Sequence, residues 1–282
     1  MNSAYFYYLL RRGVIGGGGG STFTGLLDTY SGAAAAYSLR QLSSTYSGDA
    51  ITVRRASDNT TQNIGFVNNQ LDTASLETFC SGTDGFVTTW YDQSGNANDA
   101  TQATASVQPH IVSNGTTINL NGKPAINADG VDDSFELGTP LGLSSGYSIL
   151  QVNQVPAANS YGITISSVSQ VDPSRAMIFN GLYRFTIDGT NYDNYAASSN
   201  RGSQYLWGSF VDPSDNLQSY RNSSAYGSST SVTGTFDFEK IGTNLGVNSF
   251  EFFQELIVYN SDESNNRSGI ETNINDFYSI YS

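Results

Sequence analysis

The sequence predicts an all-β fold, an antiparallel sandwich or jelly roll with a few short helices and an extended N-terminal arm. From residue 103 onward, short β-rich runs alternate with turns of Gly, Asn, Asp and Pro. Aromatic residues make up 12% of the chain and charged residues only 13%, with 29 Gly among 282 residues. This composition is typical of a sheet-rich protein with many turns.

The first 25 residues are predicted to be an anchoring arm. MNSAYFYYLLRR is dense in aromatics and Leu, and it is followed by Gly16–Gly20, five glycines that neither a helix nor a stable strand accommodates. An apolar peptide on such a tether suits docking on a neighbouring subunit, for example by adding a strand. A first strand of the same domain is the alternative. The expected anchoring residues are Tyr5, Phe6, Tyr7, Tyr8, Leu9, Leu10, Arg11 and Arg12.

Three short helices are expected. The Ala-rich run Ala33–Leu42 has high helix propensity. Asp72 is a favourable N-cap for a helix over Thr73–Cys80. The tail Ser261–Tyr281 carries apolar residues at helical spacing and predicts an amphipathic helix packed on the sandwich.

The remaining β-rich runs are the predicted strands. They cover residues 50–55, 63–67, 86–91, 116–120, 125–128, 134–137, 147–153, 162–168, 176–180, 183–187, 205–211, 217–221, 236–242 and 250–259. Because composition does not shift at any internal point, residues 26–282 are expected to be a single β-sandwich domain.

Phe86–Gln102 is the candidate binding stretch. A Trp–Tyr pair ends a predicted strand and is followed at once by a carboxylate, two amides and a tight Gly turn. A stacking surface beside hydrogen-bonding groups suits sugar recognition, although an ordinary strand-to-loop corner has the same chemistry. The predicted carbohydrate-binding residues are Trp90, Tyr91, Asp92, Gln93, Asn96 and Trp207.

Charge and residue counts exclude several classes of function. A net charge of −13 argues against a nucleic-acid partner. The single Cys80 rules out an internal disulfide framework, and the single His110 leaves a His-based triad or a zinc site with too few parts. Asp129, Asp132 and Asp133 in a Gly-containing turn are weak candidates for Ca²⁺ ligands, with a structural turn as the alternative. No other cofactor is expected.

The N-terminus does not resemble a secretory signal. Its apolar run is short, and the basic pair Arg11–Arg12 follows the run instead of preceding it. No stretch is long enough to span a bilayer. A chain with an external composition and no export signal is expected to leave the cell by another route, such as release on a phage particle.

Two blocks of sequence carry a family resemblance. Tyr30–Gln102, with YSGAAAAYSLRQLSSTYSGDAITVRRASDN, LDTASLETFC and TTWYDQSGNANDATQ, resembles the catalytic domain of the α-L-arabinofuranosidase B family. ADGVDD at 128–133 and FFQELIVYN at 252–260 are similar to concanavalin-like, laminin-G-like jelly rolls. The resemblance implies a concanavalin-like β-sandwich and, in the family's enzymes, a retaining glycosidase with two carboxylates.

The resemblance also implies where the two carboxylates would lie. The nucleophile is expected near Ser174–Phe179, which contains no acid, and the acid/base near Ile241–Gly246, which offers Thr243 and Asn244 instead. An amide cannot donate and recover a proton as a carboxylic acid does. The paired cysteines of the family are absent as well. We therefore expect a retained scaffold without catalysis, that is, not an enzyme.

Three functions follow as hypotheses. The first is a non-enzymatic bacteriophage structural protein on the virion surface (capsid decoration, head fibre or tail). Its arm would bind other virion proteins, its domain would contact host-surface glycans, and it would form a homo-oligomer. The second is a secreted α-L-arabinofuranosidase-type glycoside hydrolase with its acids at other positions. The third is a free, extracellular carbohydrate-binding lectin.

Overall fold

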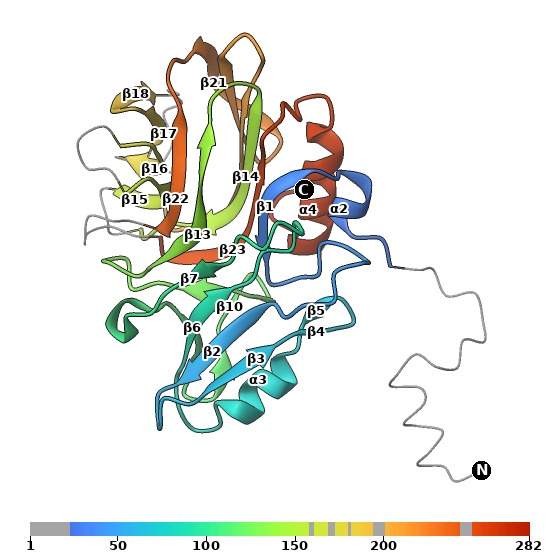
Figure 1. Cartoon of the computed structure of the whole chain (residues 1–282), viewed down its shortest axis with the longest axis vertical. Coiled ribbons are helices and arrows are strands. Elements are labelled where there is room, and N and C mark those ends of the chain that lie inside the picture. The colour runs from blue at the N-terminus through green and yellow to red at the C-terminus, as the bar shows by residue number, and fades with distance from the viewer. Residues whose placement is uncertain (1–22, 158–160, 169–172, 180–181, 194–200, 243–249) are drawn as a thin grey trace, which may run out of the picture.

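The computed structural model describes residues 23–157, 161–168, 173–179, 182–193, 201–242 and 250–282 (Figure 1). The predicted anchoring residues 5–12 and the tether lie outside this part, so the arm and the domain boundary at residue 25 stay predictions. Within the described ranges, no helix is long and apolar enough to cross a membrane.

The described strands form a two-layered antiparallel sandwich, which confirms the predicted fold class. The first layer runs in the order β21 (Ser224–Ser231), β20 (Asn216–Arg221), β19 (Tyr205–Val211), β14 (Tyr147–Gln154), β23 (Phe252–Tyr259) and β1 (Ala33–Ser38). The second runs β18 (Thr190–Asp193), β17 (Leu182–Ile187), β16 (Arg175–Phe179), β15 (Tyr161–Ser166), β22 (Phe236–Gly242), β13 (Ser134–Leu143), β7 (Ala100–Thr101), β6 (Gly85–Trp90), β2 (Ile51–Arg55) and β3 (Thr61–Ile64).

Short strands join the two layers along one edge. β8 (His110–Ser113) pairs with β6 of the second layer, and β12 (Ile126–Asn127) pairs with both β8 and β23. β9 (Thr116–Thr117) pairs antiparallel with β8. Two separate hairpins, β4 (Phe66–Val67) with β5 (Gln70–Leu71) and β10 (Asn119–Leu120) with β11 (Lys123–Pro124), lie outside this ladder.

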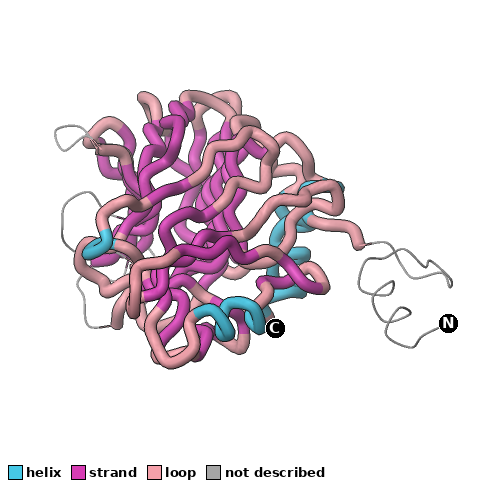
Figure 2. The backbone as a smooth tube through the Cα atoms, turned by 60° about the horizontal axis from the view of Figure 1, so that its bottom comes forward, coloured by secondary structure: helices cyan, strands magenta, loops and turns pink. Residues whose placement is uncertain are grey.

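The helices lie at the periphery of the strands (Figure 2). They are α2 (Leu26–Thr29), α3 (Thr73–Phe79), the 3-10 turn η1 (Ala105–Val107) and α4 (Arg267–Tyr278). The α3 prediction is confirmed, because the Asp72 carboxylate accepts the backbone N–H of Ser75 at 3.0 Å. The closing helix is confirmed too, although it begins at Arg267.

Aromatic side chains fill the space between the layers. Tyr147 of the first layer packs against Phe185 and Phe236 of the second, with ring centroids 6.5 and 6.4 Å apart. All three side chains are buried. Burying such large rings supplies the main driving force for closing the sandwich.

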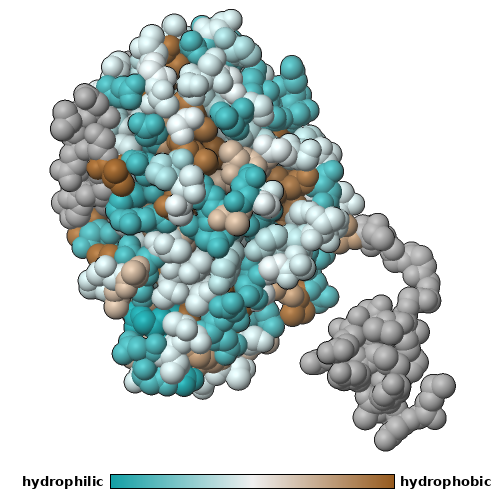
Figure 3. All heavy atoms as spheres, in the orientation of Figure 1, coloured by the Kyte–Doolittle hydropathy of each residue, from teal (hydrophilic) through white to brown (hydrophobic). Residues whose placement is uncertain are grey.

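A second, smaller core lies on the other face of the first layer. Ile270 and Ile274 of α4 pack there with Leu26 of α2 against Leu150 and Ile257 of the sheet. The strands β14 and β23 are therefore buried on both faces. The outer surface seen in Figure 3 is mostly hydrophilic, with small separate hydrophobic patches.

The helix predicted over Ala33–Leu42 is wrong. Its first part, Ala33–Ser38, forms β1, which pairs with β23 through Ala36↔Ile257 and Ser38↔Glu255. Ala35 belongs to the core between the layers and Ala36 to the core beneath α4. A strand buried on both faces is read as a continuous apolar run, which sequence periodicity does not separate from a helix.

Candidate active site

The aromatic pair of the candidate binding stretch does not form a sugar platform. Trp90 has no exposed surface and packs between Tyr37 and Phe253 in the core, with centroid distances of 5.8 and 5.9 Å. Tyr91 is half-buried, and its hydroxyl lies 2.9 Å from Oγ1 of Thr52. Since a side chain without exposed surface offers no stacking face, the prediction for Trp90 is wrong.

The polar residues that follow Trp90 hold the fold together. Asp92 Oδ1 accepts the backbone N–H groups of Ala36 and Ser94, while Oδ2 accepts the Ser94 hydroxyl and the N–H of Asn98. Four donors occupy the buried carboxylate, so little capacity is left for a ligand. The hydrogen bonds between Asp92 and Ser94 fix the conformation of the turn, as its composition suggests.

Gln93 and Asn96 are used in the same way. The Gln93 amide accepts the N–H of Leu42 at 2.8 Å and donates to the carbonyls of Ser38 and Arg40, both at 3.0 Å. Asn96 Nδ2 donates to the carbonyl of Ala33 at 3.0 Å. These amides fasten the loop to β1 and the chain after it.

Trp207 is a core residue as well. It is 1% exposed and stacks on Tyr183 at a centroid distance of 4.3 Å, with an angle of 7° between the rings. The Tyr183 hydroxyl hydrogen-bonds Gln151 and Ser209, and its burial raises its pKa to about 12. Trp207 therefore joins the two layers, and its predicted role in sugar binding is wrong.

The acidic turn brings Asp129, Asp132 and Asp133 together, with carboxylate oxygens within 4.8 Å of one another. Carboxylate oxygens are the ligands Ca²⁺ prefers. However, Asp129 Oδ1 already accepts the N–H groups of Val131 and Asp132, and Asp133 Oδ2 accepts the N–H of Asp129. Burial raises the pKa of Asp133 to about 6. These bonds explain the turn without an ion, and a Ca²⁺ site here stays a prediction.

Another group of carboxylates lies on the second layer, on β22. Phe236, Phe238 and Ile241 are fully buried in the core between the layers. The register with β13 shifts between Leu141↔Phe238 and Glu136↔Lys240. The extra residues of this bulge lie on β13. On β22, Asp237, Glu239 and Lys240 are half-buried between fully buried neighbours, which assigns them to the outer face.

Neighbouring strands hold this group in place. The Glu239 carboxylate accepts the backbone N–H of Val168, just after β15. Lys240 Nζ lies 2.8 Å from Oε1 of Glu136 on β13. Asp237 and Glu239 are both half-buried, whereas the Glu136 side chain is 63% exposed. The face therefore has two half-buried acids, a lysine and an exposed acid at its margin.

A tight turn adds a third carboxylate to this group. Asp188 and Gly189 form a two-residue hairpin loop between β17 and β18, with φ of 44° and 75°. Asp188 Oδ2 accepts the N–H of Thr235 at 3.0 Å, at the start of β22. A Cβ at Gly234 would lie 2.2 Å from the same oxygen, so only glycine allows this approach.

The resulting electrostatics favour proton donation by Asp237. Burial raises the pKa of its carboxyl group, and the negative charges of Asp188 and Glu239 raise it further. Along a strand, residues two apart lie about 6.7 Å from each other on one face. A carboxyl group with raised pKa beside an ordered carboxylate is the pairing that glycoside hydrolysis uses.

Sequence reasoning missed this pair, although a signal was present. In Phe236–Gly242 the acids alternate with buried aromatics, which assigns Asp237 and Glu239 to the outer face of the predicted strand. The positions implied by the resemblance differ. β16 provides no carboxylate over Arg175–Phe179, and residues 243–249 lie outside the described part.

Comparison with known proteins gives the context for these acids. Residues 28–159 match the family model described as "Alpha-L-arabinofuranosidase B, catalytic". The α-L-arabinofuranosidase B of Emericella nidulans is 41% identical over 86 residues, which cover 28% of this chain and 17% of that protein. Residues 28–159 carry the sequence signature of the α-L-arabinofuranosidase B catalytic domain.

Solved structures agree with this arabinofuranosidase-like domain in fold. A GH54 α-L-arabinofuranosidase variant soaked with 4-nitrophenyl α-L-arabinofuranoside has a TM-score of 0.68 at 16% identity, covering 89% of this chain and 63% of that one. An arabinofuranosidase complexed with arabinofuranosyl-α-1,2-xylobiose has a TM-score of 0.66 at 15% identity, covering 86% and 62%. The chain thus spans less than two thirds of each of these three relatives.

These findings correct the prediction that the chain is not an enzyme. The family model that matches residues 28–159 is that of a catalytic domain. That prediction depended on the identity of residues at two assumed positions, whereas β22 carries two acids on the outer face. The comparisons give no support to a virion role.

Proposed function

We propose that the arabinofuranosidase-like domain is a glycoside hydrolase that releases terminal α-L-arabinofuranosyl groups. The match of residues 28–159 to the catalytic-domain family model is the observation that carries this proposal. The acids on the outer face of β22 supply the chemistry that the reaction requires.

Asp237 is the proposed general acid. Its raised pKa keeps a proton available for the glycosidic oxygen as the bond to the anomeric carbon breaks. Glu239 is the proposed ionised partner, held in place by the N–H of Val168. It would either attack the anomeric carbon or take a proton from the attacking water. Asp188 acts as a positioning residue whose negative charge raises the pKa of Asp237.

The test is hydrolysis of 4-nitrophenyl α-L-arabinofuranoside by the purified chain, followed by nitrophenolate release. Asp237→Asn and Glu239→Gln each remove one acid with little change in shape, and each should lower kcat at least about 100-fold. NMR of the first product anomer distinguishes attack by Glu239, which retains configuration, from attack by water, which inverts it.

Glu136→Gln is the matched control. Glu136 is an exposed carboxylate on the adjacent strand, and its replacement should leave turnover within about twofold. Unchanged turnover in Asp237→Asn and Glu239→Gln would show that other acids carry the reaction. No turnover of this substrate or of other 4-nitrophenyl glycosides would refute the proposed hydrolase.

Binding without hydrolysis is the alternative function. A glycan array on which the isolated chain binds a sugar saturably, together with no turnover, would favour a lectin. Virion or extracellular localisation, oligomer formation and docking by residues 5–12 stay predictions, because no observation on the described residues bears on them.

A further inference from the structure

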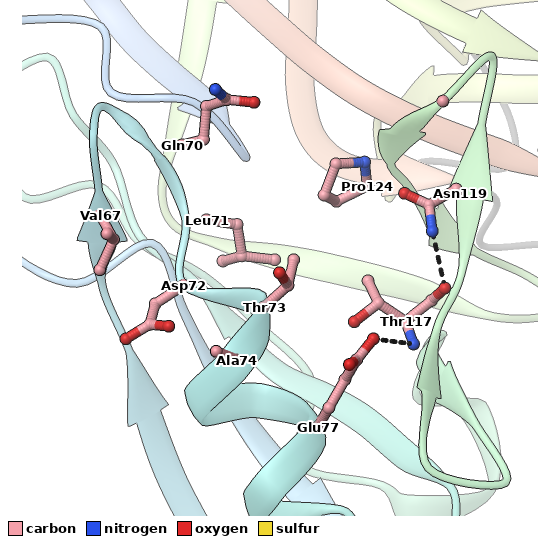
Figure 4. A pocket seen from close by; sticks show the side chains of 11 residues that line it. Val67, Gln70, Leu71, Asp72, Thr73, Ala74, Glu77, Thr117, Asn119 and Pro124 are labelled. Atoms are coloured by element: carbon pink, nitrogen blue, oxygen red, sulfur yellow. Dashed lines mark hydrogen bonds between the residues drawn. The ribbon is translucent and has the colours of Figure 1, made fainter.

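A pocket of about 390 Å³ opens far from β22 in sequence, beside helix α3 (Figure 4). The hairpin β4–β5, the first two turns of α3, strand β9 and the hairpin β10–β11 line it. Its volume lies within the range of small-molecule sites. Four separate elements thus enclose a space that the proposed hydrolytic chemistry does not use.

One polar group in this pocket has no partner. Thr117 is 5% exposed, and its Oγ1 is buried without a hydrogen bond among the described residues. Its backbone is fixed from both sides, because Glu77 Oε1 accepts its N–H at 3.0 Å and Asn119 Nδ2 donates to its carbonyl at 2.8 Å. Figure 4 shows the hydroxyl directed into the pocket. A buried hydroxyl without a partner costs free energy that a ligand could recover.

Apolar side chains complete the pocket. Leu71 is buried at its back, Pro124 lines one side, and Val67 lies at its rim with 52% of its surface exposed. Val67 is one of three large apolar residues exposed in the described part of the chain. Such a wall suits the C–H face of a sugar ring.

The charges of the lining exclude an anionic ligand. The lining contains no Lys or Arg, so an anionic ligand would lack a counter-charge. Of the two lining acids, Asp72 is occupied by the N–H and hydroxyl of Ser75. Lys123 Nζ, 3.4 Å from Gln70 Oε1, places one positive charge at the border that partly offsets the two lining acids. The carboxylate and amide oxygens of the lining accept hydrogen bonds, so they favour a ligand that has hydroxyl donors.

We propose that this pocket, lined by Val67, Leu71, Glu77, Thr117 and Asn119, is a binding site for a neutral saccharide. Thr117 Oγ1 and Glu77 bind ring hydroxyls, and Val67 with Leu71 contacts the apolar face of the sugar. The site is separate from the acids of β22 and does not depend on the proposed hydrolase function.

The test is calorimetric titration of the full chain with L-arabinose and with xylobiose, two neutral sugars that lack the arabinofuranosidic bond. Thr117→Val removes only the hydroxyl and should weaken binding about tenfold, the loss of one hydrogen bond to a buried group. Ala74→Trp places a large side chain on an exposed helix position that lines the pocket, and should abolish binding.

Thr78→Trp is the matched control for Ala74→Trp. Thr78 is also exposed on α3 but does not line this pocket, so binding should be unchanged. Thermal unfolding of each variant confirms that the fold is retained. Binding of neither sugar, sugar binding that persists in both Thr117→Val and Ala74→Trp, or binding of Ca²⁺ without sugar would each overturn the proposal. Turnover of 4-nitrophenyl α-L-arabinofuranoside is measured separately and decides only the hydrolase function.

Discussion

Arg40 and Glu255 form a buried ion pair that ties the chain after β1 to β23. Arg40 Nε lies 2.7 Å from Glu255 Oε2 and Nη2 lies 2.8 Å from Oε1, with side chains 9% and 1% exposed. Tyr278 of α4 donates its hydroxyl to the same carboxylate at 3.2 Å. One acid therefore connects the first layer to the C-terminal helix.

Removing one partner of this pair should destabilise the protein strongly. We expect Arg40→Met to lower the free energy of unfolding by about 3–5 kcal/mol, because Glu255 is left charged and buried. The double variant Arg40→Met/Glu255→Leu should lose less than Arg40→Met alone, since no isolated charge remains. Urea denaturation measures both. A double variant less stable than Arg40→Met would show that the pair is stabilising in itself.

Gly234→Ala should disturb the group of acids on β22 where it meets Asp188. The added methyl would lie 2.2 Å from Asp188 Oδ2, and the residue has a φ of 96°. We expect a loss of about 1–3 kcal/mol and lower turnover. Gly95→Ala is the control, because Gly95 has a φ of 92° but nothing within 4 Å of its new Cβ. An equal loss in the two variants would mean that backbone strain, not the contact with Asp188, is responsible.

Asp92→Asn should weaken the attachment of the loop to β1. The amide can accept hydrogen bonds through one oxygen only, so donors now bound to the second oxygen lose their acceptor. We expect about 2–4 kcal/mol of destabilisation by urea denaturation. Asp58→Asn, at an exposed ion pair with Arg55, should change stability little. A small effect in Asp92→Asn would contradict the structural role.

Asp133 gives stability a pH dependence opposite to that of an ordinary ion-paired acid. Its pKa is raised from 3.8 to about 6, so the folded state holds a proton that the unfolded state has already released. The contribution of Asp133 to the free energy of unfolding is fully present below about pH 4 and is lost as the pH rises through 6. The loss amounts to up to about 3 kcal/mol. Asp133→Asn should remove this fall, as measured by unfolding at pH 4, 5, 6 and 7.

The same variant tests the predicted Ca²⁺ site. Ca²⁺ at pH 7 should raise the Tm of the unaltered chain but not of Asp133→Asn if the three acids of the turn bind the ion. An equal Tm with Ca²⁺ and with EDTA would leave the turn a purely structural feature.

Local sequence signals predicted the elements whose partners lie close by. Asp72 caps α3 through Ser75, three residues away, and the spacing of Ile270 and Ile274 fixes the buried face of α4. Ala33–Leu42 could not be assigned in this way. Its conformation depends on β23, more than two hundred residues later, and that partner is invisible to a local pattern.

The candidate site was harder to predict because burial is a property of the assembled layers. Trp90 and Trp207 are of the residue type that stacks on sugar rings, yet closing the sandwich buries both side chains. Asp237 and Glu239 have no motif of their own. Their proximity to Asp188 arises only when the β17–β18 turn reaches the start of β22.

The position of β23 also bears on how the chain is made. It follows β1, β12 and β14 along the chain, yet it lies between β1 and β14 and also pairs with β12, so this part of the sheet is completed only once β23 has been synthesised. Until then, β1 and β14 have unsatisfied ladder edges, and such edges promote misassociation. Completion of the first layer is therefore expected to be slow, because β1 and β23 pair across more than two hundred residues of sequence.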